Sequence, residues 1–260
     1  HSIITTLNRN VQQETTRFIL GSKYHTSIIC IAKGQVIAVA SSSGTDYPFT
    51  FKTNVGSTLK PFIYTFLREN GVSSNDIFST TNIHNLNWDI REVQKSDRKF
   101  LTLKEALLLS NNNAFVNASY HIGIEKILSF LAKTTNKPVN KFVPASVLGA
   151  TIDGITLYEL INTYYRFFLD KPENPFKKEC ISILKKNAIE KFGGDILNVF
   201  LKTGTTNQNK ERYGVVGTAK MLFGFLRQGN EIDDYTKEGN FLTSIMSFLR
   251  NVRSKIYKWE

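Results

Sequence analysis

The sequence has few of the residue types that form metal centres or covalent cross-links. It contains two cysteines, Cys30 and Cys180, and four histidines. The histidines lie far apart without metal-ligand spacing, so we predict no metal and no cofactor. Cys30 lies in an apolar run and is most simply a small buried hydrophobic residue. A single disulfide between the two cysteines stays open, although nothing in the sequence requires it.

The chain also lacks an apolar run of the roughly 18 residues that a membrane span needs, and no signal peptide is visible. Its 33 basic residues exceed its 22 acidic ones, giving a formal net charge of +11. Such a charge permits contact with nucleic acid or with an anionic wall or membrane surface. Because the basic residues are spread along the chain without a nucleic-acid motif, we predict no nucleic-acid partner.

Hydrophobic periodicity predicts an α/β chain of the α+β type, with strands at both ends. Residues 27–32 and 35–40 are short β-prone runs separated by Lys33-Gly34, which predicts a hairpin. Strand character returns at 197–202 and 213–226, the latter broken by Gly217 and Gly224. A final helix is expected over about 237–258.

The middle of the chain is predicted to be all-helical. Two capping boxes, Thr102 with Glu105 and Thr156 with Glu159, mark helix starts. Strands first, helices next and strands again imply one domain over 1–260: a central antiparallel sheet covered by N- and C-terminal helices, with a helical lobe inserted at about 68–195.

One short motif points to chemistry. Ser57 and Lys60 lie three residues apart at the predicted first turn of a helix, so they share a face and the amine can reach the hydroxyl. A serine at a helix N-terminus also lies in a field that favours negative charge, which suits acyl transfer. Alone, this S-x-x-K spacing is weak evidence, because serine and lysine are common.

Two further motifs follow in a set order. They are Ser110-Asn111-Asn112, an S-x-N, and Lys202-Thr203-Gly204-Thr205, a K-T-G-T. Each has a structural alternative, a helix C-cap for the first and a strand-to-turn exit for the second. Together with Ser57 and Lys60 they match the trio found in penicillin-binding proteins and serine β-lactamases.

On these motifs the chain resembles the transpeptidase domain of a penicillin-binding protein, closest to the class A high-molecular-weight type, with a 1C-like branch as one option. Flanking residues extend the resemblance: Gly56, Pro61-Phe62, 104–107 and Thr206-Asn207. It implies a β-lactamase/transpeptidase-like fold and an extracytoplasmic place in the bacterial cell envelope. Class A relatives carry a membrane tether and an upstream glycosyltransferase domain, so the start at His1 indicates an excised fragment or an unusually small relative.

The resemblance also implies a role for each motif residue. Ser57 is the expected nucleophile, Lys60 the general base, Ser110 a proton relay and Asn112 a donor to the substrate amide. The terminal carboxylate of the substrate is expected at Lys202, Thr203 and Thr205, with Gly204 leaving room for the substrate edge. The backbone N–H groups of Ser57 and Thr205 are the expected oxyanion hole. A neutral Lys60 is needed, and burial or a nearby cation such as Lys202 would lower its pKa.

Three functions remain open at this point. A D,D-transpeptidase would crosslink peptidoglycan stem peptides ending in D-Ala-D-Ala and would be acylated by β-lactams. A D,D-carboxypeptidase or β-lactamase-like hydrolase would need a base for water, and the candidate, Glu159, occupies a capping-box position. A non-catalytic β-lactam sensor would keep the pocket without turnover. Residues 211–217 depart from the Asp-Ala-Trp stretch common in relatives, and 110–202 is compact, which leaves substrate preference open.

Overall fold

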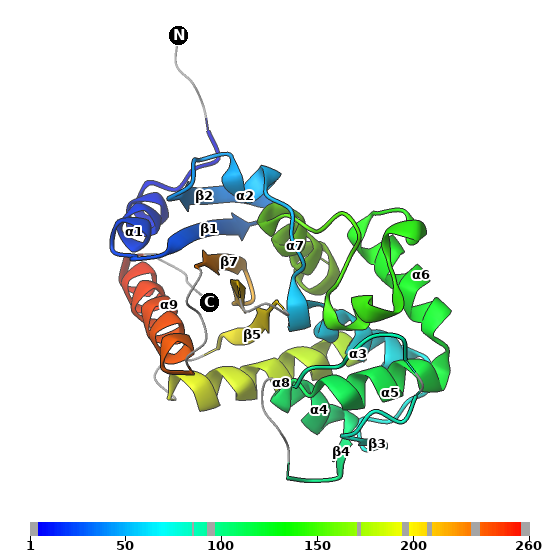
Figure 1. The fold of residues 1–260 in the computed structure, drawn as a ribbon. Coiled ribbons are helices and arrows are strands. Elements are labelled where there is room, and N and C mark those ends of the chain that lie inside the picture. The colour runs from blue at the N-terminus through cyan, green and yellow to red at the C-terminus, as the bar shows by residue number, and fades with distance from the viewer. Residues whose placement is uncertain are drawn as a thin grey trace.

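The computed structural model describes residues 5–84, 86–92, 97–170, 173–193, 198–206, 210–229 and 235–255, with only the backbone course for 235–240. Its centre is a five-stranded antiparallel sheet in the order β2-β1-β7-β6-β5 (Figure 1). The strands are β1 (His25–Ala32), β2 (Gln35–Ser41), β5 (Phe200–Thr205), β6 (Glu211–Gly217) and β7 (Met221–Gln228). The N-terminal hairpin therefore pairs with the C-terminal strand.

The hairpin between β1 and β2 forms where the sequence predicts it. Lys33 and Gly34 both have positive φ angles, 50° and 75°. Two consecutive residues of this kind are typical of the tight turn whose twist matches that of the flanking strands. The register shifts between Cys30 and Ile31 of β1, where Ile37 of β2 has no partner, and the sequence did not indicate this irregularity.

One face of the sheet is covered by the terminal helices, as predicted. Side chains alternate along β1, so Ile28 and Cys30 point to this face and Ile29 and Ile31 to the other. Helices α1 (Arg9–Leu20) and α9 (Tyr235–Lys255) lie together beside the sheet (Figure 1). The buried Glu14 carboxylate of α1 accepts from Lys255 of α9, which joins the two ends of the chain.

The other face carries the inserted lobe. Its helices are α2 (Tyr47–Thr50), α3 (Lys60–Glu69), α4 (Leu103–Leu109), α5 (Asn112–Ile122), α6 (Ile124–Thr135), α7 (Leu157–Tyr164) and α8 (Pro175–Phe192), with 3-10 turns η1 (Gly56–Leu59), η2 (Val139–Lys141) and η3 (Pro144–Leu148) and a π-helical turn η4 (Tyr165–Leu169). Both capping boxes are present, at the starts of α4 and α7.

The lobe is mostly helical, but it also holds a two-stranded sheet that was not predicted. Strands β3 (Ile77–Ser79) and β4 (Phe100–Thr102) pair antiparallel. Three residues are too few to show the alternating pattern by which a strand is recognised in sequence. This hairpin leads directly into α4 and so helps to place the S-x-N motif at its end.

Several boundaries differ from the expectation. Strand β5 runs from Phe200 to Thr205, further along than 197–202, and Leu197 lies outside the described residues. Gly224 lies inside β7 and does not break it. A β-carbon there would lie 2.2 Å from Ile161, so the glycine makes room for α7 against the sheet.

Helix α8 lies within the predicted helical lobe, but its bounds were not predicted because it has no single apolar stripe. Its buried residues Cys180 and Leu184 belong to the lobe-side core, whereas Ala188 and Phe192 belong to the core under α1 and α9. The helix therefore passes along the end of the sheet beside β5 and contacts both cores (Figure 1). In the described parts of the chain, every helix is too short or too polar to span a bilayer.

Candidate active site

Ser57 lies at the start of a helix, as the S-x-x-K spacing predicts. The short turn η1 runs straight into α3, which begins at Lys60 and has Pro61 in its first turn, a position that tolerates the missing N–H of proline. Ser57 is partly buried, whereas Lys60 is fully buried. The hydroxyl of Ser57 makes no hydrogen bond to any described residue, which leaves it open for reaction.

Two glycines allow η1 to lie against strand β5. Gly56 has a φ angle of +57°, and a β-carbon on it would lie 2.5 Å from the Thr205 carbonyl oxygen and 2.9 Å from the Thr205 nitrogen. A β-carbon on Gly204 would lie 2.4 Å from the Val55 carbonyl oxygen. The two backbones therefore approach each other more closely than any side chain would permit.

The edge of β5 that does not pair with β6 faces this turn. Among the described residues strand β5 pairs only with β6, and the Thr206 N–H donates to the Glu211 carbonyl of β6 at 3.1 Å. Because N–H groups alternate in direction along a strand, the Thr205 N–H points away from β6 toward η1. The carbonyl of Leu201 follows the same alternation and accepts from Asn187 of α8 at 3.1 Å.

Lys60 joins the first motif to the second. Its Nζ donates to the Ser110 carbonyl and to Asn112 Oδ1, both at 2.5 Å, and lies 3.5 Å from Ser110 Oγ and 5.3 Å from the centre of the Phe115 ring. Burial lowers the pKa of Lys60 from its usual 10.5 to about 7, and the negative charge of Glu92 opposes that shift. A substantial share of Lys60 is therefore neutral near pH 7.

Ser110 links both lysines. Its hydroxyl accepts from Lys202 Nζ at 2.9 Å, opposite the longer contact with Lys60. Lys202 is 1% exposed, and its Nζ also donates to the Thr203 carbonyl at 2.7 Å. Ser110 is at the same time the C-cap of α4, with a left-handed φ of 56°. Ser110 therefore both caps α4 and belongs to the site, although the sequence analysis treated these as alternatives.

Asn112 is held in a defined orientation at the start of α5. Asn111 caps this helix by accepting from the Ala114 N–H at 2.8 Å. The side chain of Asn112 accepts from Lys60 through Oδ1 and donates through Nδ2 to the carbonyl of Arg91. The amide therefore points its oxygen to the lysine and its nitrogen to the segment 86–92.

Glu92 is a residue of this site that the sequence analysis missed. Its carboxylate accepts from the backbone N–H groups of Asn112 at 3.0 Å and Asn113 at 2.7 Å, and from Asn113 Nδ2 at 2.9 Å. A carboxylate at a helix N-terminus is favoured, but Glu92 precedes the helix by about 20 residues, so no local spacing reveals it.

The hydroxyl of Thr203 in the K-T-G-T motif does not join the contacts between Lys60, Ser110 and Lys202. Side chains alternate across a strand, so Thr203 lies on the face opposite Lys202. Its hydroxyl lies 3.4 Å from Lys191 Nζ of α8. Gly204 is buried, and its missing side chain leaves room for the turn that carries Ser57; its part in admitting the substrate edge stays a prediction. Asn207, the last flanking residue, lies outside the described residues.

Glu159, the candidate base for water, is engaged elsewhere. Its carboxylate caps α7 through the Thr156 N–H at 2.8 Å and pairs with Lys137 at 2.8 Å. Burial raises its pKa, but these hydrogen bonds outweigh burial and hold the pKa below its usual value. The side chain is therefore an anion fixed in a cap.

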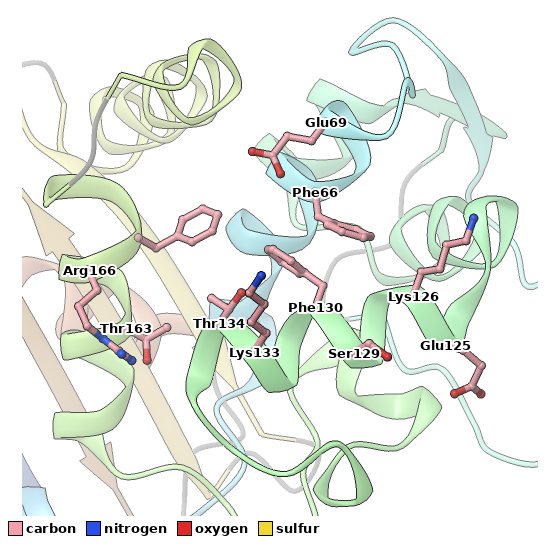
Figure 2. A pocket seen from close by; sticks show the side chains of 11 residues that line it. Phe66, Glu69, Glu125, Lys126, Ser129, Phe130, Lys133, Thr134, Thr163 and Arg166 are labelled. Atoms are coloured by element: carbon pink, nitrogen blue, oxygen red, sulfur yellow. The ribbon is translucent and has the colours of Figure 1, made fainter.

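A separate groove lies outside this arrangement. It has a volume of about 990 Å³ and lies between α3, α6 and the α7–η4 segment (Figure 2). Phe66 and Phe130 stack in it with ring centres 4.4 Å apart, and Arg166 and Thr163 line its other side (Figure 2). It contains no residue of the three motifs. Among the described residues, no three His, Cys, Asp or Glu side chains cluster as a metal site requires.

Residues 28–135 match the family model described as the penicillin binding protein transpeptidase domain. These residues include Lys60, Ser110 and Asn112, which are in contact, and Ser57, which precedes Lys60 by three residues. This part of the chain is similar to the penicillin-binding protein transpeptidase family. No curated protein sequence matches the chain.

Solved structures extend the likeness in fold to most of the chain. The penicillin-binding protein PonA1 from Mycobacterium tuberculosis is 13% identical, with a TM-score of 0.78 over 96% of this chain and 83% of that one. Penicillin-binding protein 1A from Haemophilus influenzae is 15% identical, with a TM-score of 0.67 over 87% of this chain and 48% of that one. At such identities the likeness shows the fold, which is the one expected from the sequence.

Proposed function

We propose that this chain is a D,D-transpeptidase that crosslinks peptidoglycan stem peptides through an acyl-enzyme on Ser57. The observation that carries the proposal is the contact chain from Lys60 through Ser110 to Lys202. It joins all three motifs, because Lys60 follows Ser57 by one turn and Lys202 belongs to the edge strand beside η1.

In the acylation step, neutral Lys60 takes the proton of Ser57 Oγ, which attacks the carbonyl carbon of the D-Ala-D-Ala peptide bond. The N–H groups of Ser57 and Thr205 are placed to stabilise the negative oxygen that forms, and donors of this kind contribute about 3 to 4 kcal/mol in comparable enzymes. A proton passes through the Ser110 hydroxyl to the leaving nitrogen, and D-Ala departs. Lys202 supplies a positive charge for the terminal carboxylate.

The fate of the acyl-enzyme favours transfer to an amine. Hydrolysis needs a base that activates water. Glu159 is occupied by Thr156 and Lys137, and the depressed pKa of its carboxyl makes it a poor proton acceptor. An acceptor amine from a neighbouring stem peptide is a better nucleophile than water and needs less activation.

The roles of Asn112, Thr203, Gly204 and Thr205 in binding are part of the proposal. Asn112 Nδ2 has two hydrogens, of which one goes to Arg91, so the second is left for a substrate amide. The departure at 211–217 forms strand β6 beside the K-T-G-T strand, and Tyr213 there is 1% exposed. That segment therefore forms part of the sheet. We keep as a prediction that its departure from the common sequence changes substrate preference.

We infer that β-lactams acylate Ser57 and that the chain works outside the cytoplasmic membrane, at the bacterial cell envelope. Another PonA1 structure, in complex with penicillin V, has a TM-score of 0.80 to this chain and supports the first point. The net charge of +11 suits an anionic wall. A class A type of parent protein, with a membrane tether and a glycosyltransferase domain, is consistent with PonA1 and penicillin-binding protein 1A among the similar structures.

The test is acceptor-dependent crosslinking. The protein is incubated with a pentapeptide ending in D-Ala-D-Ala, with and without an amine acceptor, and released D-Ala and crosslinked product are quantified by mass spectrometry. We expect crosslinked product that depends on the acceptor and vanishes in Ser57→Ala. Release of D-Ala at the same rate without acceptor would identify a carboxypeptidase. Penicillin labelling without any D-Ala release would identify a sensor.

A further inference from the structure

We propose that Glu92 is a positioning residue of this site, which fixes the S-x-N turn and sets the charge environment of Lys60. The inference rests on the proposed function for its kinetic consequence. Glu92 belongs to none of the three motifs and precedes Ser110 in the chain, next to Arg91, whose carbonyl accepts from Asn112. The site is therefore assembled from four parts of the chain.

The first step concerns the helix N-terminus. The first N–H groups of a helix have no partner within it, and here all three of the leading ones are satisfied. Glu92 accepts from Asn112 and Asn113, and Asn111 accepts from Ala114. A bidentate carboxylate fixes both the position and the rotation of the first turn of α5, which carries Asn112.

The second step concerns the amide of Asn112. Glu92 places its neighbour Arg91 so that the Arg91 carbonyl accepts from Asn112 Nδ2. With the nitrogen directed to that carbonyl, the oxygen of the same amide faces Lys60 Nζ at 2.5 Å. Without this restraint the amide could turn by half a rotation and present a donor to the lysine, whose charged form has three donors and no acceptor.

The third step concerns charge. Lys60 is fully buried, and burial disfavours its protonated form. Among the described residues, the charged groups that face it are Glu92, from the segment before α4, and Lys202 of β5 across Ser110. The negative charge of Glu92 raises the pKa of Lys60 against the effect of burial. Glu92 thereby keeps the pKa of the base close to neutrality.

Glu92→Gln tests the proposal, because it keeps the shape and removes the charge and one acceptor. The rate of acylation by a fluorescent penicillin should rise with pH, as in the wild type. We expect the midpoint of this rise to lie lower than in the wild type by about half a pH unit or more. The rate at high pH should fall about tenfold, which corresponds to one lost interaction of about 1.4 kcal/mol.

Glu105→Gln is the matched control. Glu105 also caps a helix next to Ser110, through the N–H and hydroxyl of Thr102, but its charge partner is Arg98. The Glu105→Gln variant should have lower thermal stability, and the midpoint of its pH–rate profile should not move. An unshifted midpoint in Glu92→Gln, or the same shift in Glu105→Gln, would overturn the proposal.

A second measurement separates this inference from the proposed function. The ¹³Cε resonance of Lys60, assigned by its absence in Lys60→Arg, reports the titration of the amine directly. If the wild type is not acylated at all, the proposed function fails, and the Lys60 titration still decides the role of Glu92. A downward shift of that titration in Glu92→Gln supports the proposal, and an unchanged titration rejects it.

Discussion

The carbonyl oxygen of Gly56 occupies the space where a side chain on Gly149 would begin. A β-carbon on Gly149 would lie 2.0 Å from that oxygen, and the φ angle of Gly149 is +88°. The Gly149 carbonyl in turn accepts from the Val55 N–H at 3.1 Å. The loop after η3 therefore supports the turn that carries Ser57.

Gly149→Ala should consequently damage both the fold and the site. The left-handed backbone costs alanine about 1 to 2 kcal/mol, and the collision adds about 1 to 3 kcal/mol. Gly193→Ala is the matched control, because Gly193 has a φ angle of +73° but open space around it. Urea denaturation should show the larger loss in Gly149→Ala, together with slower penicillin labelling. Equal losses of stability and normal labelling in both variants would contradict this account.

Ser57→Ala should abolish covalent labelling by penicillin while leaving the fold intact, because a small residue at the start of a helix costs little. Intact mass spectrometry of the wild type should show one added drug mass, mapped to the peptide that contains Ser57. The adduct should persist long after free drug is removed, since the carboxylates of Glu92 and Glu159 are both held by other partners and are not free to activate water. Rapid return to the unmodified mass would indicate a β-lactamase and make Glu159→Gln the next variant to test.

The acylation rate should rise with pH through about 7. The pKa of Lys60 is lowered from 10.5 to about 7, so the amine loses its proton and becomes a base as pH rises through that value. Lys60→Arg should remain slow at every pH, because arginine keeps its proton. Lys104→Arg, at an exposed lysine bonded to Asn75, should keep the wild-type profile. A flat wild-type profile would remove Lys60 from the role of base.

The two cysteines should be unreactive in the folded protein. Cys30 and Cys180 are free, fully buried and in different cores, and burial raises the pKa of both thiols. A thiol reagent such as DTNB should react with neither until the protein is unfolded in denaturant, when it should detect two thiols without prior reduction. Detection of fewer than two in unreduced, unfolded protein would show that they had been oxidised.

Features with a local cause were predictable from the sequence. The Lys33-Gly34 turn, the capping boxes at Thr102 and Thr156, and the place of Ser57 on a helix each depend on residues a few positions apart. The order of the three motifs then supplied the family, and with it the fold.

Features that depend on distant partners were not predictable. Glu92 acts on a helix about 20 residues away, and Gly224 is explained only by Ile161 of α7. Helix α8 divides its buried side between two cores, so its sequence lacks a stripe. The hydroxyl of Thr203 lies close to Lys191, a contact for which the motif gives no signal.

The pairing of β1 with β7 has a consequence for how the molecule is made. These strands lie near opposite ends of the chain, and their partners run from His25 with Gln228 to Ala32 with Met221. On the ribosome, the middle of the sheet cannot close until the last strand has emerged, and such distant pairings form slowly. Reactivity toward β-lactams should thus appear only at the end of folding. A nascent chain that stops before β7 should not label, although it already contains every motif residue.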